Sequence, residues 1–217
     1  MAWAPLFGAT VASVGLLWAL LHRNPESTAS TLAGLRLAAL LMSTGAAFAL
    51  EDPAASTLAS SPTGLRARQG LRLGLLLLTL AALWTAVAAA AAVLAGVAPS
   101  ALPLGAATLE AVAMLAVALA VTAAASRTAD GRGGVTGSSA LLLAMLAALL
   151  GQQRWPRHLT VFPFEPSDPA WELAHTRWFG VLVGAVVVLA AACSDPARRP
   201  LAQTGLVPPR NRQRRSM

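Results

Sequence analysis

The stretch LRLGLLLLTLAALWTAVAAAAAVLAGV, residues 71–97, decides the fold class, because its one charged side chain is Arg72, near its start. At about 1.5 Å of rise per residue, a helix of this length exceeds the hydrocarbon core of a bilayer, which is about 30 Å thick. The whole chain is 56% hydrophobic and 12% charged, whereas soluble domains carry roughly 25% charged residues. Such a chain cannot cover a water-facing surface, so the sequence predicts a multi-pass membrane protein.

Similar apolar stretches recur along the chain and predict an all-α, polytopic transmembrane helical bundle of about six spans. The expected spans are residues 3–21, 30–50, 71–97, 102–125 and 138–150, and a last helix that starts near Asp168 and crosses over residues 179–192. Residues 1–193 form the transmembrane domain. Residues 194–217 are expected to form an Arg-rich, disordered cytoplasmic tail, because their composition is polar and poor in core residues.

The arginines predict the orientation of the chain, because cytoplasmic connections carry an excess of basic residues. One side holds Arg66, Arg68, Arg72, Arg127, Arg132, Arg198, Arg199, Arg210, Arg212, Arg214 and Arg215, and the other holds Arg23, Arg154, Arg157 and Arg177. We therefore expect both termini in the cytoplasm and the bundle in the plasma membrane. All 16 basic residues behind the net charge of +7 are arginine, as GC-rich actinobacterial codon usage favours, so this charge does not indicate nucleic-acid binding.

Two charged residues, Arg36 and Glu110, lie inside predicted spans. A charge near the bilayer centre costs about 2.5 to 3.5 kcal/mol on insertion scales, and such residues usually pair inside the bundle. Both spans run in the same direction, so the two side chains fall at similar depths. We expect either an ion pair that fixes helix register or an arginine that snorkels outward. The alternative is a carboxylate that handles a proton or a substrate.

The remaining candidate positions are weaker. Gly180 and Gly184 are four residues apart, which predicts close helix packing of the last span within the bundle. His158, Glu172 and His175 are weak metal candidates, but the dense spacing of zinc sites is missing, so no metal site is predicted. We find no catalytic constellation and no cofactor fingerprint. The chain is therefore not expected to be an enzyme or to carry a cofactor.

The connection EDPAASTLASSPTGLRARQGLR, residues 51–72, is the most polar one between the early spans. Asp52 followed by Pro53 reads as a helix N-cap and first-turn pair. One interpretation is a capped cytoplasmic turn followed by topology-setting arginines. The other is a docking element for a cytoplasmic partner, built from Glu51, Asp52, Pro53, Arg66, Arg68 and Arg72.

Four segments together resemble the small membrane subunits of actinobacterial ABC-type transporters. They are AFALEDPAAST, GLRARQGLRLGLLL, DPAWELAHTRW and SDPARRP. The resemblance implies a permease that works with a separate cytoplasmic ATPase subunit, with residues 51–60 as the coupling helix. Two alternatives stay open: a small secondary transporter or ion channel using an intramembrane carboxylate, and a non-transporting membrane scaffold or assembly factor. Whether the chain forms homo- or hetero-oligomers is also left open.

Overall fold

The computed structural model describes residues 3–23, 27–49, 65–127, 133–152, 154, 156 and 159–194. These residues form six α-helices, one short 3-10 turn and no strand. The helices are α1 (Ala4–Arg23), α2 (Thr28–Ala49), α3 (Leu65–Ala95), α4 (Leu104–Ala125), α5 (Gly133–Gln152) and α6 (Trp171–Ala192), with the 3-10 turn η1 (Pro99–Ala101) between α3 and α4. Each α-helix is long and apolar enough to cross a membrane. The predicted all-α fold with six spans is confirmed.

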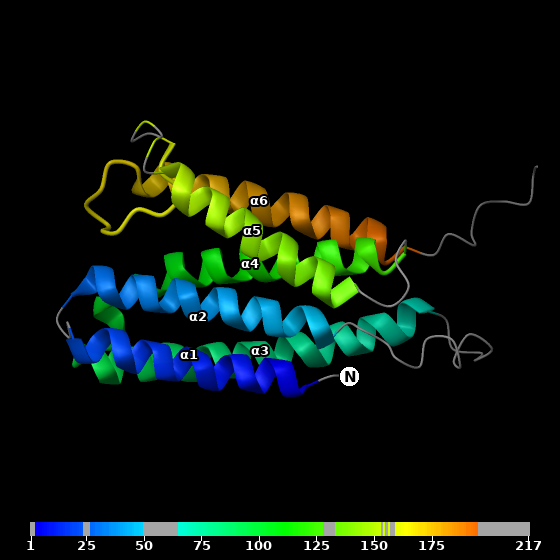
Figure 1. The fold of residues 1–217 in the computed structure, drawn as a ribbon, viewed down its shortest axis with the longest axis horizontal. Coiled ribbons are helices and arrows are strands. Elements are labelled where there is room, and N and C mark those ends of the chain that lie inside the picture. The colour runs from blue at the N-terminus through cyan, green and yellow to red at the C-terminus, as the bar shows by residue number, and fades with distance from the viewer. Residues whose placement is uncertain are drawn as a thin grey trace, which may run out of the picture.

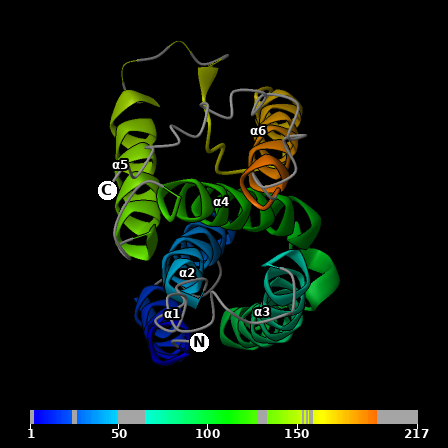
Figure 2. The same ribbon diagram turned by 90° about the vertical axis from the view of Figure 1, so that its right-hand side faces the viewer.

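Helices α2 and α4 form the centre of the bundle. Helix α2 packs against α1, α3, α4 and α5, and α4 packs against α2, α5 and α6. Figure 2 shows α4 lying between the α1–α2–α3 layer and the α5–α6 layer. In the most apolar window of each helix, 67% of α2 and 50% of α4 is buried, against 28% or less of the others. The two central helices are thus shielded by the other four.

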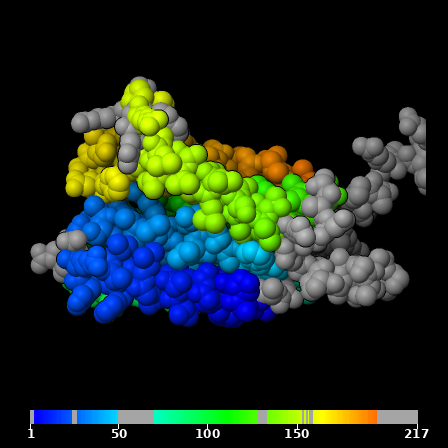
Figure 3. Space-filling view, in the orientation of Figure 1, coloured from blue at the N-terminus to red at the C-terminus, as the bar shows by residue number. Residues whose placement is uncertain are grey.

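The outer surfaces of the peripheral helices are apolar. Large side chains such as Val11, Leu78, Val93, Leu143 and Val187 are exposed, and Val93 is 80% exposed. Figure 3 shows one long face, formed by α1, α2 and α5. Apolar exposure on this scale is not found on soluble monomers, whereas lipid tails cover it without cost. The chain is therefore an integral membrane protein.

Helix α1 begins and helix α6 ends at the same end of the bundle, opposite the long loop between α5 and α6 (Figure 1). Helix α3 has 31 residues whereas the other α-helices have 20 to 22. It begins at Leu65 rather than near residue 71, and its first turns project beyond its neighbours at the end where α1 begins. Arginine and glutamine are good helix formers, so the residues before the apolar stretch continue the helix.

Glycines at two helix crossings permit close backbone approach. A Cβ atom added at Gly45 of α2 would lie 2.9 Å from the carbonyl oxygen of Pro5, at the start of α1. A Cβ atom added at Gly137 of α5 would lie 2.8 Å from the carbonyl oxygen of Ala118 in α4. Both contacts are shorter than real Cβ atoms show, so larger residues would push these helices apart.

The predicted packing of Gly180 and Gly184 within the bundle is wrong. A Cβ atom at either position would meet nothing within 4 Å, and both glycines are exposed on α6. The buried face of α6 is formed by Ala174, Trp178 and Ala185, which lie on another side of the helix. Spacing by four residues marks a helix stripe but does not say which side of the helix meets a neighbour.

Candidate functional site

Arg36 of α2 and Glu110 of α4 form a bidentate ion pair inside the bundle. The Nε atom of Arg36 donates to Oε2 of Glu110 at 2.6 Å, and Nη2 donates to Oε1 at 2.8 Å. The residues are 8% and 1% exposed. They lie about 12 Å and 9 Å from the starts of their helices, at about 1.5 Å per residue. Because both helices start at the same end of the bundle, the two side chains meet at one level, and Arg36 does not snorkel outward.

His175 of α6 is a third member of this cluster. Its Nε2 atom lies 3.3 Å from Oε1 of Glu110, and its Nδ1 atom lies 2.7 Å from the carbonyl oxygen of Trp171. We call Arg36, Glu110 and His175 the polar cluster. His175 also lies near the start of its helix, and α6 starts at the same end as α2 and α4. Three helices that run in parallel therefore bring their polar residues together.

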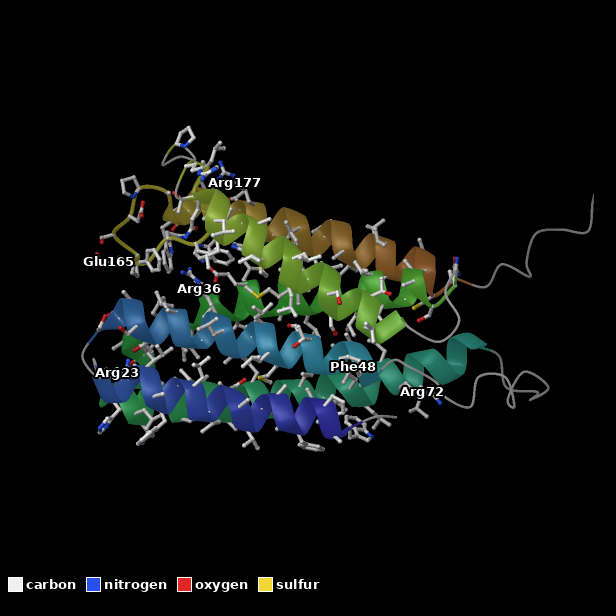
Figure 4. The ribbon with its side chains drawn as sticks, in the orientation of Figure 1. Arg23, Arg36, Phe48, Arg72, Glu165 and Arg177 are labelled. Atoms are coloured by element: carbon white, nitrogen blue, oxygen red, sulfur yellow. The ribbon has the colours of Figure 1, made fainter. Side chains whose placement is uncertain are left out.

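The loop between α5 and α6 covers the polar cluster. The guanidinium of Arg36 makes a cation–π contact with the ring of Phe162, with 5.3 Å between Cζ and the ring centroid. Phe162 also packs against Trp178, with ring centroids 5.4 Å apart, and the Nε1 atom of Trp178 donates to the carbonyl oxygen of Val161 at 3.0 Å. Figure 4 shows Arg36 beneath this loop, which also carries Glu165. Aromatic rings and a tryptophan hydrogen bond thus hold the loop over the cluster.

Two nitrogen atoms of the polar cluster are buried without a hydrogen-bond partner: Nη1 of Arg36 and Nε2 of His175. A guanidinium offers five N–H donors, and the contacts with Glu110 use only the edge formed by Nε and Nη2. A buried polar group without a partner costs about 1 to 3 kcal/mol, and a charged group costs more.

The other predicted site residues do not join this cluster. Glu172 is exposed, and its backbone carbonyl oxygen accepts a hydrogen bond from the hydroxyl of Thr176. Within the described ranges, no three His, Cys, Asp or Glu side chains are grouped so that they could hold a metal ion. Glu51, Asp52, Pro53 and His158 lie outside the described residues. The same holds for the predicted tail beyond Ser194.

The arginines of the predicted docking element lie in α3. Arg66 and Arg68 belong to its first turns, although their side chains lie outside the described part of the chain. Arg72 is half-buried near the projecting end of α3, where Figure 4 labels it. These residues are therefore at the opposite end of the bundle from the polar cluster.

The contact of His175 with Glu110 has no local signal in the sequence, where His175 stands with His158 and Glu172 as a weak metal candidate. The signal that points to it is positional. Like Arg36 and Glu110, His175 lies within the first three turns of a helix that starts at the loop-covered end. The second, fourth and sixth spans run in the same direction, so ionisable residues at similar distances from their starts are candidates for contact.

Comparison with protein-family models, with curated proteins and with solved structures finds no match for this chain.

Proposed function

We propose that this chain is the membrane-embedded subunit of a transporter. The observation that carries the proposal is the buried cluster of Arg36, Glu110 and His175. Ionisable residues inside membrane helices are costly to insert, and they usually mark the path of a substrate, an ion or a proton. The bundle already has an apolar core along α2 and α4, so a scaffold would gain little from burying three such side chains.

The proposed location is the plasma membrane, with both termini in the cytoplasm. The sequence supports this orientation, because arginines are in excess in the connections after the second and fourth spans and in the segment after the sixth. It places the polar cluster in the outer half of the bilayer, beneath the extracellular loop between α5 and α6.

A separate cytoplasmic ATPase is the proposed energy source. At about 1.5 Å per residue, the 31 residues of α3 reach about 46 Å, which exceeds the hydrocarbon core of about 30 Å. The excess lies at the arginine-bearing end, where a soluble partner has access to it. The resemblance to ABC-type permease subunits gives the same assignment, with residues 51–60 as the contact.

The ATPase proposal is tested by purifying the full chain from membranes of its native host under mild detergent and identifying bound proteins by mass spectrometry. We expect a nucleotide-binding subunit with a Walker motif. Replacing Glu51 and Asp52 by alanine is expected to abolish its co-purification without unfolding the bundle. The matched control is Glu165→Ala, an exposed carboxylate in the loop at the other end. If no ATPase is captured with the unaltered chain, this energy source is wrong.

A second candidate is a proton-coupled carrier or a channel that uses Glu110. The contact between Glu110 and His175 favours it, because proton pathways use chains of such groups. Proteoliposomes distinguish the two proposals. A proton-coupled carrier would transport its substrate under a pH gradient without any partner, and this substrate flux would be lost in Glu110→Gln. An ATPase-driven permease would transport only with the partner subunit and ATP present. Unchanged flux in Glu110→Gln would exclude the carboxylate mechanism.

A further inference from the structure

The hydrogen bond between His175 and Trp171 identifies one protonated nitrogen of the imidazole. Nδ1 of His175 lies 2.7 Å from the carbonyl oxygen of Trp171. A carbonyl oxygen can only accept a hydrogen bond, so Nδ1 must carry the proton. In a neutral imidazole the other nitrogen, Nε2, would then hold an unprotonated lone pair.

That second nitrogen faces a carboxylate oxygen. Nε2 lies 3.3 Å from Oε1 of Glu110, and Glu110 already accepts two hydrogen bonds from Arg36. A carboxylate that accepts a bidentate arginine is ionised and has no proton to donate. Without a proton between them, Nε2 and Oε1 would be two buried acceptors in contact, which repel each other.

We propose that Nε2 of His175 is a proton-binding site inside the membrane, held by the charge of Glu110, whose Oε1 atom lies 3.3 Å away in an ion-pair contact that falls short of hydrogen-bond geometry. The bound proton resides on Nε2 and makes His175 a cation. Glu110 then bridges two cations, Arg36 of α2 and His175 of α6. This assignment rests on hydrogen-bond chemistry and holds whichever energy source the transporter uses.

Several other charged groups lie on the described parts of the elements around His175. On α6 itself, Glu172 is exposed, and Arg177, two residues after His175, lies about 200° around the helix from it. In the covering loop, Asp168 accepts a hydrogen bond from the backbone N–H of Ala170, and exposed Glu165 accepts one from the hydroxyl of Ser167. Within the described residues, α4 supplies only Glu110 and α2 supplies only Arg36 as charged groups near His175.

Release of the proton changes the packing of α6. The attraction between His175 and Glu110 becomes a repulsion between two acceptors at 3.3 Å. The Trp171 ring, whose centroid lies 4.4 Å from that of His175, moves with the start of the helix. Proton binding is thereby coupled to the packing of the start of α6 against α4.

The test is nitrogen-15 NMR of histidine side chains in the full chain, reconstituted in lipid nanodiscs. His22→Gln and His158→Gln leave His175 as the single histidine. At pH 7 we expect both nitrogens of His175 to be protonated. In Glu110→Gln we expect loss of the cationic signal and a neutral ring protonated on Nδ1. The control Glu172→Gln removes an exposed carboxylate from the same helix and is expected to keep the cationic signal.

Two outcomes would overturn the proposal: a neutral His175 at pH 7 in the parent, or equal protonation of His175 in the parent and in Glu110→Gln. A second measurement needs no change at Glu110, in case that variant misfolds. In the parent, the indole N–H resonance of Trp171, assigned with Trp171→Phe, is expected to shift over the pH range in which the cationic signal disappears. A Trp171 resonance that stays constant over that range would refute the coupling to α6. Neither readout requires transport, so a failure here is distinct from a failure of the transport proposal.

Discussion

Removing one partner of the buried ion pair is expected to destabilise the bundle far more than removing both. Glu110→Leu leaves the guanidinium of Arg36 buried and unpaired, and Arg36→Met leaves the Glu110 carboxylate without its two hydrogen bonds. Breaking a buried pair in this way costs about 3 to 5 kcal/mol, whereas replacing both partners by apolar residues of similar volume is often neutral. Snorkelling relieves part of the cost for an arginine, so about 3 kcal/mol is expected for each single variant.

The measurement is the free energy of unfolding by SDS titration in mixed micelles, followed by circular dichroism. In the double variant His175 loses its counter-ion and is expected to be neutral, so no buried charge is left without a partner and stability should lie within about 1 kcal/mol of the parent. The resulting coupling energy between Arg36 and Glu110 is well above the value of about 0.6 kcal/mol that intramembrane hydrogen bonds show on average. Glu172→Leu, at an exposed carboxylate of α6, is the control and should change stability by less than about 0.5 kcal/mol. If the loss of unfolding free energy in the double variant equals the sum of the losses in the two single variants, the pair does not act as one unit.

Three further outcomes are expected. Gly137→Ala should destabilise the bundle by about 1 to 3 kcal/mol in the same titration, because the added Cβ has no room against α4. Gly180→Ala places its Cβ in open space and should be neutral or slightly stabilising, so equal effects of the two variants would contradict the described packing. Trp178→Phe removes a hydrogen bond worth about 1 kcal/mol and should speed hydrogen exchange in the loop between α5 and α6, while exchange in α1 stays unchanged. A membrane-impermeant maleimide should label the single cysteine, Cys193, only in permeabilised cells. After Cys193 is replaced by serine, Ser167→Cys should be labelled in intact cells, and the reverse pattern would show that the proposed orientation is inverted.

The apolar stretches were sufficient to predict six spans because crossing a bilayer is a local requirement on length and hydropathy. The boundaries were less predictable. Helix α3 starts before its apolar stretch does. Helix α5 starts at Gly133, whereas the polar residues at its start had placed the predicted span from residue 138 onward. A helix continues through polar residues wherever its backbone is satisfied, so hydropathy marks the membrane-crossing part and not the ends of the helix.

The polar cluster was predictable in part. Arg36 and Glu110 stand out in sequence because charges inside apolar spans are rare, and matching depth made them candidates for a pair. His175 did not stand out, because it lies near the polar start of its span, beside Glu172. Trp178 similarly has the position of an interfacial anchor, yet it is 3% exposed and packs under the loop.

The sequence by itself determined that the chain inserts into a bilayer and that it does so as six helices. Both properties follow from the free energy of transfer of each segment from water to lipid, considered alone. Only the tertiary structure decided which helix faces meet. It placed α2 and α4 at the centre, turned Gly180 and Gly184 outward and Gly137 inward, and brought His175 of α6 to Glu110 of α4. Lipid solvates all apolar helix faces about equally, so hydropathy cannot rank them. Close packing and the pairing of the few buried polar groups make that choice.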